Sequence, residues 1–142
     1  MLTESRSEKD TYAAGYALGK KLGGGSVVLL SGFLGVGKTV FAKGIAAALG
    51  IAEEVLSPTF TLLREYKTSG GLMLYHIDAY RIKDAQEAVE AGLAECIGAK
   101  NAVTLVEWHE NITDLFKEHK TIVVEIQPVK NDSDKREITI HE

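Results

Sequence analysis

Eight residues in the first third of the chain carry the residue types that bind phosphate. Residues 32–39 read GFLGVGKT and fit the pattern G-x-x-x-x-G-K-[ST]. The three glycines would let backbone N–H groups point at phosphate oxygens without a clash from a Cβ atom. Lys38 would add a positive charge at the β- and γ-phosphates, and the Thr39 hydroxyl could bind Mg²⁺. The pattern therefore predicts a phosphate-binding P-loop.

The segments on either side of this loop have the composition that a P-loop needs. Residues 27–30 are VVLL, which is typical of a buried parallel strand, and residues 40–49 favour a helix. A helix that begins near Lys38 would direct its positive dipole end at the phosphates. The alternative interpretation is a glycine turn with a lysine that faces solvent, and the order strand, loop, helix disfavours it.

Two carboxylates follow apolar strands later in the chain. Asp78 follows a strand predicted at residues 72–77, and Glu107 follows a strand predicted at residues 102–106. In P-loop proteins a carboxylate at the end of a neighbouring strand lies near Mg²⁺ and the attacking water. The alternative for each is a helix N-cap or a surface carboxylate. We expect both to approach the metal or the water, and the sequence leaves open which one binds the metal directly.

Three other residues have both a functional and a structural interpretation. Thr59 follows a proline in a loop and could sense the γ-phosphate or Mg²⁺, or could be an ordinary turn threonine. Trp108 could stack on a base or a partner, although such a tryptophan more often packs in the core. His76 alternates with apolar residues, which favours a structural role. The other histidines show no metal-ligand spacing with one another or with Cys96, so we predict no zinc site.

The absence of certain sequence motifs limits which nucleotide the chain is expected to bind and which reaction it is expected to catalyse. A GTPase would show Asp-x-x-Gly after its metal-binding strand, whereas Asp78 is followed by Ala-Tyr-Arg, and no Asn-Lys-x-Asp stretch is present. Adenine is therefore the better prediction. The four arginines are scattered, which does not favour the arginine-bearing lid of a small-molecule kinase. Arg136 could contact the nucleotide or could be a surface residue of a strand.

The remaining segments predict further helices and strands. Residues 7–22 favour a helix in which Tyr12 and Tyr16 would form one apolar face. Residues 60–78 favour an antiparallel hairpin with a Ser-Gly-Gly turn. Short helices are expected at residues 84–91, 92–97 and 112–116, and alternating strands at 121–127 and 136–141, joined by a turn at 131–134.

These elements define the predicted fold class. We expect one α/β domain, residues 1–142, with the P-loop NTPase-like three-layer fold. Its mixed central sheet would be parallel around the P-loop strand and antiparallel in the hairpins beside it.

Composition limits the class of protein. The 142 residues carry a formal net charge of −4, which argues against a large direct nucleic-acid surface. One cysteine allows no internal disulfide. The N-terminal residues show no apolar signal-peptide core, and no apolar run is long enough to span a bilayer. We therefore expect a cytoplasmic protein.

Four stretches together resemble one known family, the TsaE family of bacterial ATPases that act in threonylcarbamoyladenosine modification of tRNA. The stretches are the P-loop at 32–39, Ser-Pro-Thr-Phe-Thr at 57–61, Tyr-His-Ile-Asp-Ala-Tyr-Arg at 75–81, and Leu-Val-Glu-Trp at 105–108. They occur in the family's order and at compatible separations, and the resemblance extends from about residue 7 to residue 140. The P-loop is widespread, whereas the other three stretches together are specific.

The resemblance implies a Mg²⁺-dependent ATPase that assists two partner proteins, TsaB and TsaD. TsaD transfers the threonylcarbamoyl group to adenosine in tRNA. The sequence leaves open whether this chain touches tRNA directly, and its net charge of −4 favours contact through the complex. By resemblance, the phosphates would contact Leu34, Gly35, Val36, Gly37, Lys38 and Thr39. Mg²⁺ would bind Thr39 and Glu107, Asp78 and Thr59 would be switch and catalytic positions, and Glu8, Thr11 and Arg136 would contact the nucleotide.

One position departs from the family pattern. The family often has aspartate after the first P-loop glycine, where this chain has Phe33, so any role of that aspartate in hydrolysis or in partner binding is in question.

Two other functions remain open. The first alternative function is a small-molecule kinase, which would transfer phosphate to an acceptor other than water. The second is a nucleotide-gated binding module with negligible catalysis.

Overall fold

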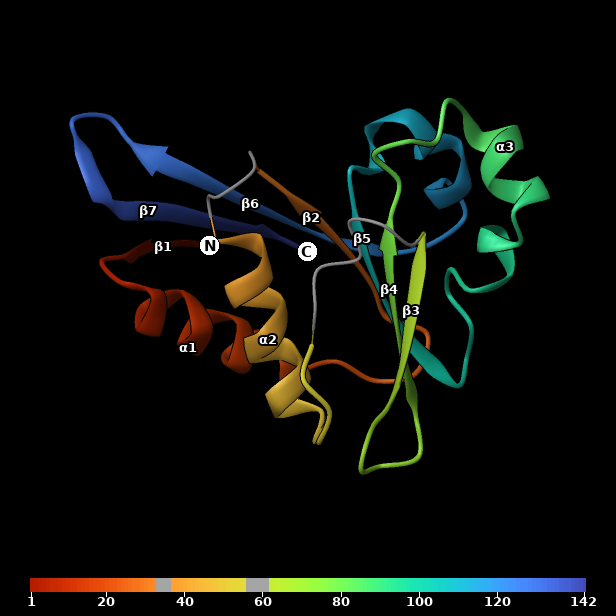
Figure 1. Ribbon diagram of the computed structural model, residues 1–142, viewed down its shortest axis with the longest axis horizontal. Helices are drawn as coiled ribbons and strands as arrows, with labels where there is room; N and C mark the ends of the chain where they lie inside the picture. Colours follow the sequence, from red (N-terminus) through yellow and green to blue (C-terminus); the bar gives the residue numbers. More distant parts are fainter. Residues whose placement is uncertain (33–36, 56–61) are drawn as a thin grey trace.

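The computed structural model describes residues 1–32, 37–55 and 62–142, and within them the strands form one seven-stranded sheet (Figure 1). The strand order across the sheet is β1-β7-β6-β2-β5-β4-β3. The strands are β1 (Leu2–Ser5), β2 (Val27–Ser31), β3 (Leu63–Lys67), β4 (Met73–Asp78), β5 (Ala102–Glu107), β6 (Thr121–Val129) and β7 (Asp132–His141). The α-helices are α1 (Glu8–Gly19), α2 (Lys38–Ala48) and α3 (Ala85–Glu90), and the 3₁₀-helices are η1 (Leu93–Glu95) and η2 (His109–Phe116).

Strand β2 lies at the centre of the parallel part of the sheet. It pairs in parallel with β5 on one side and with β6 on the other, and β4 continues the parallel arrangement beyond β5. The pairs β1–β7, β6–β7 and β3–β4 are antiparallel. The mixed sheet that the sequence predicted is therefore confirmed. Its parallel strands surround β2, the β3–β4 hairpin forms one edge, and the β6–β7 hairpin lies next to β1 at the other edge.

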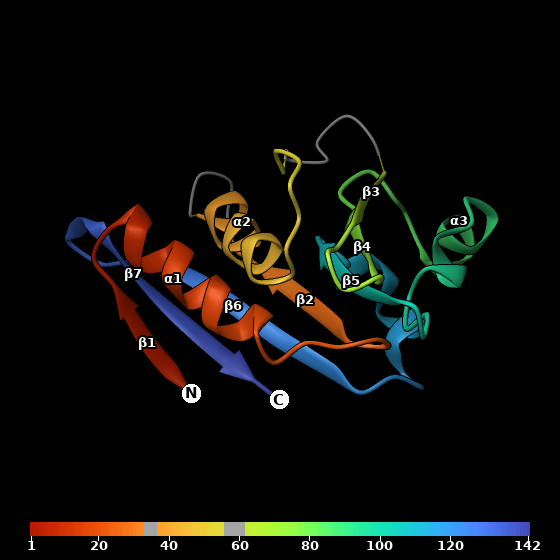
Figure 2. The ribbon, with the colours of Figure 1, turned by 90° about the horizontal axis from the view of Figure 1, so that it is seen from below.

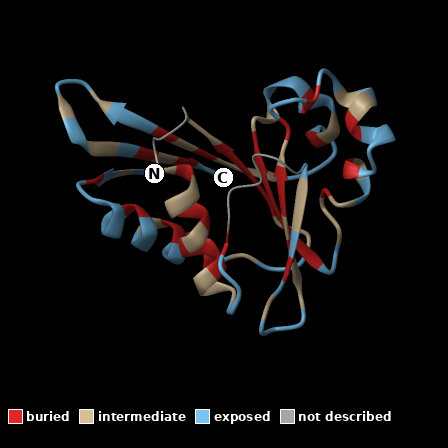
Figure 3. Cartoon of the chain, viewed as in Figure 1, coloured by how far each residue is buried: buried red, intermediate tan, exposed pale blue. Residues whose placement is uncertain are grey.

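Helices cover both faces of this sheet, and the side chains of β2 alternate between them. Val28 and Leu30 join the core formed with α1 and α2, where Phe41 of α2 is fully buried. Val27 and Leu29 join a second core formed with α3, η1 and η2. Figure 2 shows α1 and α2 together over β2, β6 and β7, and Figure 3 shows the buried residues concentrated in the central strands and the inner side of α2. Because β2 is apolar on both faces, it occupies the middle of a three-layer fold.

The predicted apolar face of the N-terminal helix is wrong. Tyr12 and Tyr16 of α1 are 40% and 39% exposed, whereas Gly15 and Gly19 are buried. A Cβ atom on Gly15 would lie 2.1 Å from the Phe41 carbonyl oxygen of α2. The two helices cross so closely that the backbone of these glycines lies against α2, while Leu18 is the bulky apolar side chain of α1 that is buried in the same core.

Gly44 of α2 makes the matching close approach, and we predict that Gly44→Ala destabilises the fold. Its Cβ atom would lie 2.1 Å from the Tyr12 carbonyl oxygen and 2.8 Å from the Tyr16 nitrogen, so the helices would have to move apart. Overpacking of this kind costs about 1–3 kcal/mol of unfolding free energy. Gly23→Ala is the control, because nothing lies within 4 Å of its Cβ position. Urea unfolding of both variants measures the difference; equal midpoints would contradict the close crossing.

Several element boundaries also differ from the predictions. The sequence did not predict β1, and the β6–β7 strands extend further toward each other than expected, with a left-handed Asn131 (φ +68°) between them. The segment expected as a helix at 92–97 is the 3₁₀-helix η1, and the one expected at 112–116 is the longer 3₁₀-helix η2. Asp84 caps α3, since its side chain accepts a hydrogen bond of 2.9 Å from the Glu87 N–H. Among the residues described, no helix has both the length and the apolar character needed to cross a membrane.

Candidate functional site

Lys38 is the first residue of α2 and is almost completely buried. It follows Gly37, whose φ of +113° lies in the region that glycine adopts without strain. Only 6% of Lys38 is exposed. Thr39 is the next residue of α2 and is half-buried. The strand-to-helix context predicted for this motif is present, with β2 before the loop and α2 after it. Leu34, Gly35 and Val36, which the sequence assigned to the phosphates, lie outside the described residues.

Glu107 lies beside Lys38 because β5 is the neighbour of β2. In the parallel register Glu107 pairs with Leu30, near the carboxyl end of both strands. Its Oε1 atom is 3.6 Å from Lys38 Nζ, and only 5% of Glu107 is exposed. A lysine and a glutamate predicted independently from the sequence therefore form a buried ion pair.

The second oxygen of Glu107 contacts His76 of β4. His76 Nε2 is 2.6 Å from Glu107 Oε2, and His76 is fully buried. Burial alone would raise the pKa of Glu107, but the hydrogen bond with His76 and the charge of Lys38 outweigh burial and lower that pKa. Glu107 is therefore an ionised carboxylate held by two partners.

Asp78 ends β4 directly beside Glu107 in the parallel register between β4 and β5. Its Oδ1 atom accepts a hydrogen bond of 2.8 Å from the Tyr80 N–H. Burial raises the pKa of Asp78, the Tyr80 hydrogen bond opposes that effect, and the nearby charge of Glu107 adds to it, so that the pKa lies above its ordinary value. The two carboxylates predicted to work together thus lie at the same edge of the sheet.

The ring of Trp108 lies beside Lys38 and Tyr80 packs against that ring, and sequence reasoning did not place either of them in the site. Lys38 Nζ lies 4.2 Å from the centre of the Trp108 ring, and Tyr80 packs edge-on against Trp108 with ring centres 5.0 Å apart. Trp108 is half-buried and has a left-handed backbone (φ +57°) directly after Glu107. Its position next to the predicted carboxylate was the signal that could have identified it.

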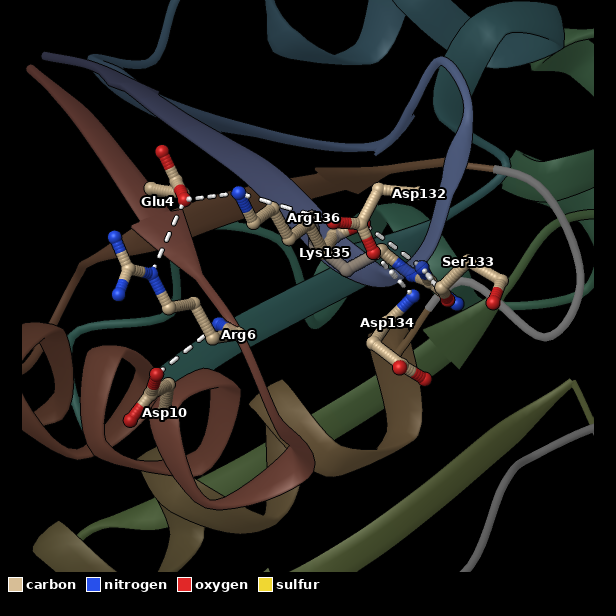
Figure 4. Close-up of polar contacts among 8 residues, drawn as sticks. All are labelled: Glu4, Arg6, Asp10, Asp132, Ser133, Asp134, Lys135 and Arg136. Atoms are coloured by element: carbon tan, nitrogen blue, oxygen red, sulfur yellow. Dashed lines mark hydrogen bonds and ion pairs between the residues drawn. The ribbon is translucent and has the colours of Figure 1, made fainter.

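A separate cavity of about 390 Å³ adjoins the start of α2 at Gly37. Glu8, Thr11 and Arg136, which the resemblance assigned to the nucleotide, all line it. They come from α1 and β7, which lie far apart in the sequence. Figure 4 shows the charged side chains at this end of β1 and β7, where Arg136 Nη1 donates to the Ser133 carbonyl oxygen at 2.7 Å. The structure therefore brings these three residues together beside the first turn of α2.

Two further observations concern the extent of the candidate site. Thr59, the predicted switch residue, lies outside the described residues. Another cavity, of about 760 Å³, is lined by residues of α1, β1 and the end of β7, and none of the predicted site residues lines it. Among the described residues, the buried charged side chains are Lys38 and Glu107, and neither lines this cavity.

Comparison with known proteins decides the family. A family model described as "Threonylcarbamoyl adenosine biosynthesis protein TsaE" matches residues 5–138. The chain belongs to the TsaE family. A tRNA threonylcarbamoyladenosine biosynthesis protein TsaE from Treponema pallidum is 41% identical over 136 residues, which cover 96% of each chain. The TsaE of Bacillus subtilis is 45% identical over 116 residues, covering 81% of this chain and 68% of the relative.

A solved structure agrees with this assignment. The crystal structure of Bacillus subtilis YdiB superposes with a TM-score of 0.78 at 31% sequence identity, and the match covers 99% of this chain and 83% of that one. The family resemblance predicted from the sequence is confirmed. Two of the four stretches on which the resemblance was based, 75–81 and 105–108, contain residues that contact one another beside Lys38.

Proposed function

We propose that this TsaE-family chain is a Mg²⁺-dependent P-loop ATPase, and that its ATP binding and hydrolysis drive turnover of a TsaB–TsaD complex in threonylcarbamoyladenosine modification of tRNA. The observation that carries the proposal is the buried pair of Lys38 and Glu107 at the start of α2, with Asp78 beside Glu107. Buried charges that converge at the carboxyl ends of parallel strands are typical of a nucleotide phosphate site.

On the phosphate side, Lys38 would move from Glu107 toward the β- and γ-phosphates. The N-terminus of α2 would add its dipole, and Gly37 permits the backbone to turn toward the phosphates. Loop residues 34–36 would donate backbone N–H groups. These charges and donors would stabilise the negative charge that develops as water attacks the γ-phosphate in line.

The residues present fit a magnesium ion. Mg²⁺ prefers hard oxygen ligands, and it would find the Thr39 hydroxyl and the Glu107 carboxylate, which is ionised because its pKa is lowered. Bound there, Mg²⁺ would neutralise the charge of the β- and γ-phosphate oxygens. Asp78, whose pKa is raised, would orient the attacking water, and Thr59 would respond to the γ-phosphate as a switch residue.

The cavity beside Gly37 would hold the nucleoside. Glu8, Thr11 and Arg136 line it, and its volume of about 390 Å³ suits a ligand of nucleoside size. The chain lacks the guanine-reading sequence motif, which favours adenine. Since the formal net charge is −4, we propose that tRNA is reached through the partner complex and not by direct binding.

We predict that hydrolysis by the isolated chain is slow and that TsaB and TsaD stimulate it at least several-fold. Lys38 is the cation that lies beside Glu107, and additional positive charge from a partner would stabilise the transition state further. The measurement is phosphate release in single-turnover and steady-state assays, with and without the purified partners. Phosphate transfer to an acceptor would favour a kinase instead, and tight ATP binding with no turnover in any mixture would favour a binding module.

A further inference from the structure

His76 is a buried polar residue to which the proposed mechanism gives no task. It is 0% exposed and lies in β4 between Leu74 and Asp78 on the same face of the sheet. A buried imidazole without a polar partner would cost free energy, so its contacts indicate why it is there. The contact that it makes is with Glu107, at 2.6 Å.

The strand register explains how this contact forms. His76 pairs with Leu105 of β5, and Glu107 is two residues further along the same strand and points to the same face. The imidazole therefore reaches diagonally across the strand pair to the carboxylate. A carboxylate can only accept, so His76 Nε2 carries the proton of this hydrogen bond. His76 Nδ1 is buried and has no hydrogen-bond partner within the described part of the chain.

The two oxygens of Glu107 have different partners. Oε2 accepts from His76, whereas Oε1 faces Lys38 Nζ at 3.6 Å. The terminal torsion of a glutamate has a broad energy profile, so a carboxylate without fixed partners would rotate. If Lys38 turns to the phosphates of a nucleotide, the His76 hydrogen bond can still hold the carboxylate in this orientation.

We infer that His76 is a positioning residue, which holds the Glu107 carboxylate so that Oε1 faces the metal and the phosphates in the nucleotide-bound state. The inference rests on the proposed function, because it assigns Glu107 to Mg²⁺. Hydrogen-bond partners of metal ligands typically contribute about 10- to 100-fold to metal affinity or activity.

The test compares nucleotide affinity with Mg²⁺ and with EDTA, using a non-hydrolysable ATP analogue and calorimetry. His76→Phe removes the donor but keeps a ring, and it should reduce the Mg²⁺-dependent gain in affinity by about 10- to 100-fold while leaving affinity in EDTA unchanged. His76→Gln keeps an N–H that can reach Oε2, and it should restore most of the gain. His141→Phe, at the exposed end of β7, is the matched control and should behave as wild type.

A second measurement uses the wild-type chain and so does not depend on a variant's folding. With ¹⁵N-labelled histidine, the His76 Nε2–H signal should persist when Mg²⁺ and the analogue bind. Its loss on binding would overturn the inference, as would a full Mg²⁺-dependent gain in His76→Phe or an equal loss in His76→Gln. Those results would not contradict the proposed nucleotide site. Absence of any nucleotide binding by the wild type would instead reject the proposed function and, with it, the role of His76.

Discussion

Lys38→Ala is expected to lower the rate of ATP hydrolysis by about 100-fold or more, because it removes the cation proposed to stabilise the charge that develops on the phosphate. The structure gives the change a second effect. Lys38 Nζ lies 3.6 Å from Glu107 Oε1 and 4.2 Å from the centre of the Trp108 ring, so alanine removes both contacts. The pKa of Glu107 should rise when this charge is lost. Steady-state phosphate release and nucleotide titration measure the effect.

Lys43→Ala provides the matched control for Lys38→Ala. Lys43 lies in the same helix, α2, and has no assigned part in the site. It tests whether loss of any positive charge on that helix weakens phosphate binding. We expect Lys43→Ala to hydrolyse ATP like the wild type. If Lys38→Ala also retained full turnover while folded, the phosphate site would have to lie elsewhere.

The strand and helix on either side of the predicted P-loop were predictable because their signals are local. An apolar run followed by glycines and an apolar helix has few other interpretations, and β2 and α2 are found where residues 27–30 and 40–49 predicted them. Asp78 and Glu107 were paired on a topological argument, that parallel strands end at the same edge of a sheet. The register confirms their proximity. Their roles toward Mg²⁺ and water remain predictions.

The structure differs from the prediction where tertiary packing overrides local pattern. Leu2–Ser5 has weak strand character by itself and becomes β1 because the edge of β7 offers it backbone partners. In α1, Tyr12 and Tyr16 suggested an apolar face, yet the close crossing with α2 selects Gly15 and Gly19 for the buried side. A hydrophobic pattern reports which side chains are apolar, so it does not reveal a helix contact in which glycine backbone makes the closest approach.

His76 and Trp108 show a different reason for incomplete prediction. Each had a functional and a structural interpretation. The apolar neighbours of His76 and the residue type of Trp108 favoured the structural one. The deciding information is the partner: Glu107 for the His76 ring nitrogen, and Lys38 for the face of Trp108. Both partners come from other strands or helices, so no spacing within one segment reveals them. Such residues are recognised as part of the site only when their contacts across the fold are known.

Glu107→Gln is the second change with a large expected effect, because it preserves shape and removes only charge. The glutamine oxygen can still accept from His76, so the side chain should keep its place in the site. ATP hydrolysis should nevertheless fall by about 100-fold or more, since the carboxylate proposed for Mg²⁺ is gone. Glu118→Gln, an exposed position, is the control. Hydrolysis by folded Glu107→Gln at the wild-type rate would remove Glu107 from the mechanism.

The same variant should change how stability depends on pH. The pKa of Glu107 is lower in the folded chain than in the unfolded chain, so its ionisation stabilises the fold above the ordinary glutamate pKa of about 4.3. That contribution is lost as the pH falls from there toward the folded-state value. Glutamine cannot titrate, so Glu107→Gln should lose less stability than the wild type between about pH 7 and about pH 3 in denaturant unfolding. Because His76 and Lys38 produce the lowered pKa, an equal acid sensitivity in both proteins would mean that the buried ion pair does not form in solution.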